Sequence, residues 1–104
     1  MTGQIEVTDN PEASRLEVRL GDDVAFAEYQ RARGGMVFPH TVVPKAFEGK
    51  GVGSALVKAG LRMAGAEGLK VIPLCPFFAA YLAKHTEHWD QVDRRYRDRV
   101  GAKA

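Results

Sequence analysis

The chain has 104 residues, of which 45% are hydrophobic and 27% charged, and its formal net charge is +2 at pH 7. This balance is typical of a chain with one hydrophobic core, and no apolar run approaches the ~18 residues that a membrane span requires. The small net charge gives no general argument for nucleic-acid binding. We therefore expect a single domain over residues 1–104 in the cytoplasm, with neither a membrane nor nucleic acid as partner.

Short apolar patterns and turn residues alternate in the first forty-odd residues. The segment Arg15–Leu20 alternates charged and apolar residues, which predicts a strand with one face in water. Strands are also expected at residues 4–8, 24–31 and 36–43, the first ended by Asp9-Asn10-Pro11 and the last by Pro44. The short connections between them, including Gly34-Gly35, predict an antiparallel meander.

The hydrophobic period changes after Gly53. From Ser54 to Glu67, apolar residues recur at helical spacing, so a core-facing helix is expected, followed by a buried parallel strand at residues 69–74. A second helix should begin at Pro76, and one C-terminal helix should dock through a stripe that contains Trp89, Val92, Tyr96 and Val100. The expected fold is α+β: an antiparallel meander, a strand–helix–strand unit and C-terminal helices.

Three alternating glycines occupy the junction between the last strand of the meander and the first helix, in Glu48-Gly49-Lys50-Gly51-Val52-Gly53-Ser54. Glycine lets backbone N–H groups approach an anion closely, and a helix N-terminus adds partial positive charge. A P-loop is excluded because Lys50 is followed by Gly51 rather than Ser or Thr. A dinucleotide-binding fingerprint is also excluded. Its glycines follow the first strand of a parallel strand–helix–strand unit, whereas here an antiparallel meander precedes the glycines. The pattern predicts a pyrophosphate site or, alternatively, a tight turn without function.

This loop resembles the Gln/Arg-x-x-Gly-x-Gly/Ala loop of the GNAT superfamily, with Glu48 as the one departure. The resemblance is wider than the loop. It also includes His40-Thr41-Val42-Val43-Pro44, Ser54-Ala55-Leu56-Val57, Leu74-Cys75-Pro76-Phe77 and Ala79-Ala80-Tyr81. In content and order, these segments look like the small single-domain branch of that superfamily.

The resemblance implies acetyl-CoA as co-substrate, no metal, and an amine as acceptor. The diphosphate of coenzyme A would rest on the backbone amides of residues 49–54. Its pantetheine arm would pair, as an added strand does, with the backbone of the strand that ends at Val42 and Val43. The implied cofactor-binding residues are Val42, Val43, Gly49, Lys50, Gly51, Val52, Gly53, Ser54, Lys84 and His85.

Three side chains are candidates for catalysis. By the resemblance, Tyr81 would protonate the departing thiolate, although it could instead only pack on the sheet. His40 could serve as the base or be structural. Cys75 could carry the acetyl group, contact the substrate, or fill space in the core; direct attack by the amine is the route the family usually takes.

Two other functions remain open. The chain could bind coenzyme A or acyl-CoA without turnover, or it could be an RNA- or protein-interaction module that uses the basic segment 93–99. The second of these leaves the glycine loop unexplained. Since only a turn fits between the first two strands, the acceptor side should be open, which suits a protein or peptide amine.

Overall fold

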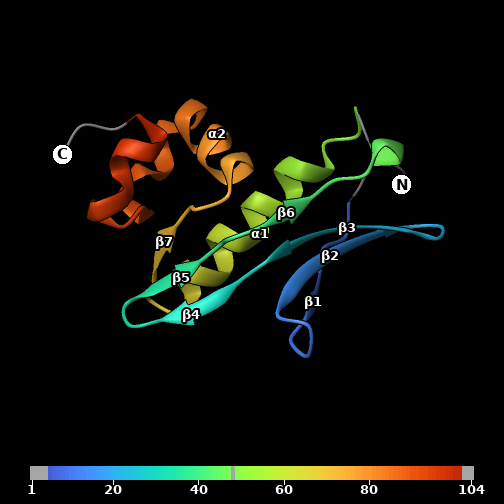
Figure 1. The fold of residues 1–104 in the computed structure, drawn as a ribbon, viewed down its shortest axis with the longest axis horizontal. Coiled ribbons are helices and arrows are strands. Elements are labelled where there is room, and N and C mark those ends of the chain that lie inside the picture. The colour runs from blue at the N-terminus through green and yellow to red at the C-terminus, as the bar shows by residue number, and fades with distance from the viewer. Residues whose placement is uncertain (1–4, 48, 102–104) are drawn as a thin grey trace.

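The computed structural model describes residues 5–47 and 49–101. The strands of two small sheets lie alongside the central helix α1 (Val52–Ala66), and three short helical segments gather at one end of the molecule (Figure 1). The expected α+β class, with a meander, a strand–helix–strand unit and C-terminal helices, is confirmed.

The first sheet is entirely antiparallel, in the order β1-β2-β3-β6. Its strands are β1 (Thr8–Asn10), β2 (Arg15–Leu20), β3 (Asp23–Glu28) and β6 (Thr41–Val42). The second sheet has the order β4-β5-β7, with β4 (Gln30–Ala32), β5 (Gly35–Val37) and β7 (Lys70–Ile72). The pairing of β5 with β7 is parallel, as the strand–helix–strand unit requires.

The strand predicted at residues 15–20 has the expected bounds, but the strand predicted before it is misplaced. Gln4 lies outside the described residues, and β1 takes in Asp9 and Asn10, which were expected to break the strand. Asn10 pairs with Arg15, and the Tyr29 hydroxyl donates to a carboxylate oxygen of Asp9 at 2.6 Å. These tertiary partners outweigh the turn preference of Asp and Asn, and the turn falls at residues 11–14 instead.

The two other long predicted strands are each divided between the two sheets. The chain leaves the first sheet at Tyr29, whose amide donates to the Ser14 carbonyl, and returns to it between Phe38 and Thr41. Pro39 lies at the return point, where its missing N–H cannot contribute to a ladder. One continuous hairpin therefore crosses from one sheet to the other.

Helix α1 (Val52–Ala66) lies against the sheets, as the periodicity predicts. Its buried face is formed by Val52, Gly53, Leu56, Val57, Gly60, Leu61 and Ala64. The helix ends where Gly68 adopts φ +69° and Leu69 N donates to the Ala64 carbonyl at 2.9 Å, a left-handed glycine ending.

The C-terminal region differs from the prediction of one helix. After α2 (Pro76–Lys84) come two 3-10 segments, η2 (Thr86–Gln91) and η3 (Arg94–Val100). Between them Val92 forms a parallel β-bridge with Val71 of β7. The backbone at Val92 is therefore extended, and it adds to the second sheet next to β7. The docking stripe itself is confirmed: Val92 and Val100 are buried, and Trp89 and Tyr96 pack against the core.

No helix among the described residues is long and apolar enough to cross a membrane.

Gly60 and Gly65 provide a test of the packing of α1. A Cβ on Gly60 would lie 2.8 Å from Cε1 of Phe38 and 3.1 Å from Cζ of Phe78, two buried rings stacked 4.4 Å apart. Gly65 is exposed, and a Cβ there would meet only the Gln91 amide nitrogen at 3.4 Å. Alanine improves helix propensity by ~1 kcal/mol at either position, whereas overpacking costs ~1–3 kcal/mol at Gly60 alone.

We therefore expect Gly65→Ala to be as stable as the parent or more so, and Gly60→Ala to be less stable than Gly65→Ala by at least ~1 kcal/mol in urea unfolding. Equal stability of the two variants would mean that the aromatic pair is not tightly packed on α1.

Candidate functional site

The glycine loop leads into α1 through two residues with left-handed backbone conformation. Gly49 and Gly51 have φ values of +75° and +74°, a conformation that side chains disfavour, and Gly51 is the N-cap of the helix. The Lys50 amide donates to the Phe47 carbonyl at 3.2 Å and closes the turn. The amides of residues 52–54 begin the helix and so have no acceptor within it. These amides can bind an anion together with the helix dipole.

Gly53 has a further, packing reason to be glycine. A Cβ at this position would collide with Cζ of Phe77, so the ring of Phe77 rests on the first turn of α1. Phe77 is nevertheless 41% exposed. The loop and the start of α2 are therefore in direct contact.

A pocket opens where the returning strand leaves the second sheet. Phe38 still belongs to that sheet: its amide donates to the Ile72 carbonyl and its carbonyl accepts from the Cys75 amide, both at 3.0 Å. Two residues later, the His40 carbonyl accepts instead from Glu28 N in the first sheet, at 2.8 Å. The two chains diverge from this point. The cavity between them is about 510 Å³ and is lined by Pro39, His40, Thr41, Cys75, Pro76 and Phe77.

Cys75 lies at the inner wall of this pocket. It is the N-cap of α2, its side chain is only 3% exposed, and its thiol donates to the Thr41 hydroxyl oxygen at 3.1 Å. The bond joins the two diverging chains through side chains. Sequence reasoning did not single out Thr41, because its role depends on a residue 34 positions away.

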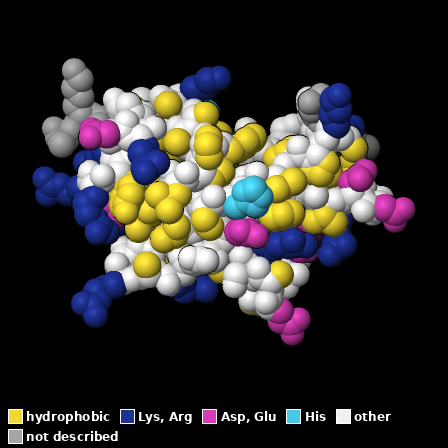
Figure 2. All heavy atoms as spheres, viewed as in Figure 1, with side chains coloured by type: hydrophobic (Ala, Val, Ile, Leu, Met, Phe, Trp, Pro, Cys, Tyr) yellow, Lys and Arg dark blue, Asp and Glu magenta, His cyan; other side chains and the backbone are white. Residues whose placement is uncertain are grey.

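His40 lies at the opposite wall, on the other face of the strand from Thr41. Its ring is 6.2 Å from the ring of Phe26, tilted by 59°, and the guanidinium of Arg15 lies 4.3 Å above Phe26. Figure 2 shows a histidine over β6, with hydrophobic side chains on both sides and charged side chains next to it. The structure thus places His40 and Cys75 around one pocket.

Tyr81 is not among the residues that line this pocket. It lines a different cavity of about 530 Å³ between α1, α2 and η2, where its ring stacks on His85 at 4.0 Å. Burial, and next the negative charge of Glu87, raise the pKa of the Tyr81 hydroxyl. His85 lines the same cavity, with Nδ1 3.6 Å from a Glu87 oxygen, while Lys84 is exposed to solvent.

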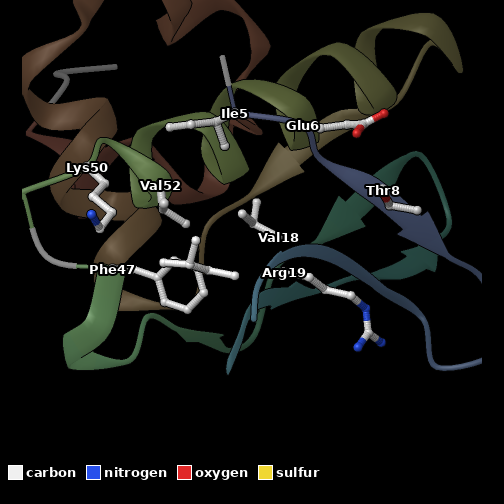
Figure 3. A pocket seen from close by; sticks show the side chains of 9 residues that line it. Ile5, Glu6, Thr8, Val18, Arg19, Phe47, Lys50 and Val52 are labelled. Carbon is white, nitrogen blue, oxygen red and sulfur yellow. The ribbon is translucent and has the colours of Figure 1, made fainter. Parts of the chain in front are cut away.

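Lys50 and Val52 line a third cavity, of about 470 Å³, between the N-terminal segment, β2 and the loop. In Figure 3 the side chains of Val18, Phe47 and Val52 converge there, and Lys50 extends from the loop beside them. Val52 is buried, so any contact of this residue with a phosphate would use its backbone amide.

An ionic cluster that the sequence did not reveal supports the outer face of β2. Glu17 is 4% exposed, and its oxygens accept from Asn10 Nδ2 at 3.1 Å, Arg15 Nε at 2.6 Å and Arg19 at 3.3 Å. The hydrogen bond from Arg15, followed by the one from Asn10, holds the pKa of Glu17 below its usual value. Alternation predicted Glu17 on the wet face, and it does lie there, but neighbouring side chains cover it.

A family model for GCN5-related N-acetyl-transferase matches residues 15–92. The chain belongs to this family. The match includes both walls of the pocket and the glycine loop, so the domain is an acyltransferase domain of the GNAT type. No curated protein sequence matches the chain. Among residues 5–47 and 49–101, no group of three His, Cys, Asp or Glu side chains is arranged to hold a metal ion.

The Glu17 cluster predicts a pH dependence of stability. Because the folded-state pKa of Glu17 is depressed, its contribution is present above the unfolded value near 4.5 and is lost as the pH falls through the folded-state pKa. Glu17→Gln should lower the free energy of unfolding by about 1–2 kcal/mol at pH 7, and the difference should shrink below pH ~4.

Urea unfolding between pH 3 and 7 measures this difference, with Glu12→Gln, in the exposed turn, as the matched control. A difference that stays constant over this range would show that Glu17 titrates normally in the folded protein.

Proposed function

We propose that this protein is an acetyl-CoA-dependent N-acetyltransferase in which an amine attacks the thioester directly, within a ternary complex. The observation that carries the proposal is the pocket between the diverging chains, which has a histidine and a cysteine on its walls in a chain of the GNAT family. In α/β proteins, ligands bind at the carboxyl ends of strands where the connections diverge.

The coenzyme would enter beside the glycine loop, with its diphosphate on the amides of residues 51–54. Gly51 is the N-cap of α1, and residues 52–54 form the first turn of the helix. The hydrogen bond from the Lys50 amide to the Phe47 carbonyl holds the chain just before them. The pantetheine arm would follow Val42 and Val43, which are only half-buried. On this path the arm passes Phe77, whose exposed ring separates the loop from the pocket.

Acyl transfer forms a C–N bond and breaks the C–S bond of the thioester. The attacking nitrogen must lose a proton, which we assign to His40, and the departing thiolate must gain one to give free coenzyme A. Cys75 would contact the thioester from the inner wall, with its thiol oriented by Thr41. The role of Tyr81 as the acid stays a prediction from the resemblance, because its ring lies in the other cavity.

The placement of Tyr81 favours one alternative, a protein that binds acyl-CoA without turnover. Such a protein would use the same coenzyme-binding residues, so only acetyl transfer distinguishes it from an enzyme. Mass spectrometry of a broad amine panel after incubation with acetyl-CoA makes that distinction. We further propose a cytoplasmic location and, because the His40 side of the pocket is exposed, a protein or peptide amine as acceptor.

Acetyl-CoA should stabilise the protein, because it binds the folded state only. At about 100 times its dissociation constant the gain is ~2.7 kcal/mol, which raises the melting temperature by several degrees. If millimolar acetyl-CoA leaves melting unchanged and calorimetry detects no heat, the proposed function is wrong.

The same titration applied to Gly53→Ala tests the loop, with Phe77→Ala and the double variant as controls. Gly53→Ala should bind acetyl-CoA at least ~10-fold more weakly if the methyl group blocks the phosphates, and the double variant should remain weak. If the double variant binds as tightly as Phe77→Ala, Gly53 serves only to accommodate the Phe77 ring.

Cys75→Ala should retain measurable acetyl transfer. Direct attack needs no enzyme thiol, so the reaction should continue without Cys75. We expect a rate loss of roughly 10-fold, because the Thr41 hydroxyl loses its hydrogen-bond partner, and a coenzyme affinity that is nearly unchanged. Steady-state kinetics with both substrates varied gives the measurement. Ping-pong kinetics, or a Cys75 acetyl adduct that an amine discharges at a competent rate, would show a covalent route instead.

A further inference from the structure

We propose that Glu28 is the residue that binds the protonated amino group of the acceptor, next to His40 on the outer face of the first sheet. The inference rests on the proposed function, and it assigns the acceptor to a class: amines that carry a positive charge when they bind. Phe26 supplies the apolar surface for the carbon chain next to that charge.

The register of β3 and β6 places Glu28 beside His40. Phe26 is paired with Val42 and Ala27 with Thr41, and the next step in the same antiparallel register sets Glu28 opposite His40. The hydrogen bond from Glu28 N to the His40 carbonyl, at 2.8 Å, confirms this step. Side chains directly opposite on antiparallel strands project from the same face, with Cβ atoms about 5 Å apart. A carboxylate and an imidazole therefore lie side by side on the outer face of the first sheet, and the imidazole of this pair also lines the pocket.

The negative charge of Glu28 is available to a ligand. Its cross-strand partner on the other side is Arg15, which is the obvious candidate to neutralise it. Arg15 is instead engaged by Glu17, at 2.6 Å from Nε to Oε2, and its guanidinium lies 4.3 Å above the Phe26 ring. Among the described residues, no Lys, Arg or His nitrogen lies within 4.0 Å of the Glu28 carboxylate.

This arrangement suits a primary amine at neutral pH. Such an amine is protonated in water, so a half-buried carboxylate attracts it, and the exposed part of Phe26 packs on its carbon chain. His40 then takes one proton from the ammonium group, and the neutral amine attacks the thioester carbon and displaces the thiolate of coenzyme A. The second proton that the nitrogen loses as the amide forms goes to that thiolate and gives free coenzyme A. Glu28 lies on the His40 side of the strand, whereas Thr41 and Cys75 lie on the coenzyme side, so the two substrates would approach from different faces.

A different role for Glu28 predicts different data. If the carboxylate acted by orienting the His40 ring, its loss would slow transfer to charged and neutral acceptors alike. If it binds the ammonium group, its loss should affect charged ligands only and should be visible in binding without turnover.

Binding of phenethylamine, a primary amine charged at pH 7, to the coenzyme A-loaded protein is the test. Chemical shifts in nitrogen–proton NMR spectra report the affinity for the parent and for Glu28→Gln, with Glu12→Gln as matched control and 2-phenylethanol as the uncharged isostere of the ligand. Glu28→Gln should bind phenethylamine roughly 5-fold more weakly, with unchanged affinity for 2-phenylethanol and for coenzyme A, and Glu12→Gln should match the parent.

Three results would overturn the proposal: equal binding of phenethylamine by Glu28→Gln and the parent, equal binding of the amine and the alcohol by the parent, or no shifts around β3 and β6. Coenzyme loading is monitored by its own shifts, so a failure of coenzyme binding would count against the proposed function and is separately visible. If Glu28→Gln does not fold, Glu28→Ala is measured in its place, with the same expected loss.

Discussion

The aromatic contact between Phe38 and Phe78 over Gly60 determines how the rest of the molecule is arranged. Phe38 is fully buried, its backbone is bonded to both Ile72 and Cys75, and its ring stacks on Phe78 at 4.4 Å. One residue thus joins the returning strand, the parallel strand β7 and the start of α2, while α1 accepts the two rings only because Gly60 has no side chain. Rings so closely packed resist movement, so this contact holds together the two chains from which the pocket opens, at Pro39 and at Cys75.

Divergence just after Phe38 gives the two faces of one short strand different environments. On the inner face Thr41 accepts from the Cys75 thiol, and on the outer face His40 lies near Phe26 and Glu28. A strand alternates its side chains by necessity, so consecutive residues can serve two substrates that approach from opposite faces. A strand as short as β6 can serve both substrates, because only Thr41, the preceding His40 and the pantetheine-pairing residues Val42 and Val43 take part.

Electrostatics on the outer face depends on how the charges are paired rather than on how many there are. The Glu17 carboxylate accepts hydrogen bonds from Arg15, Arg19 and Asn10, and these donors lower its pKa. Arg15 is thereby directed to Glu17 and onto Phe26, which leaves Glu28 next to His40 with its charge available. An ion pair on one strand thus sets the charge that the neighbouring strands present.

The sequence by itself determined the elements whose signals are local. The alternation at 15–20, the helical period after Gly53, the proline at the start of α2 and the glycine pattern before α1 each depend on neighbours within a turn or a strand, and all of them lie where expected. The segments His40 to Tyr81 that resemble the GNAT superfamily lie within the residues that match the family model.

Only the tertiary structure decided what depends on partners far apart in the chain. Asp9 and Asn10 belong to a strand because Asp9 accepts a hydrogen bond from Tyr29 and Asn10 pairs with Arg15. The C-terminal helix is interrupted because Val92 forms a β-bridge with Val71. The bond from Cys75 to Thr41, the placement of Tyr81 away from the pocket and the juxtaposition of Glu28 with His40 likewise follow from the point at which a strand changes sheets. Local propensity differs by at most ~1 kcal/mol per residue, so a few buried contacts between distant segments outweigh it.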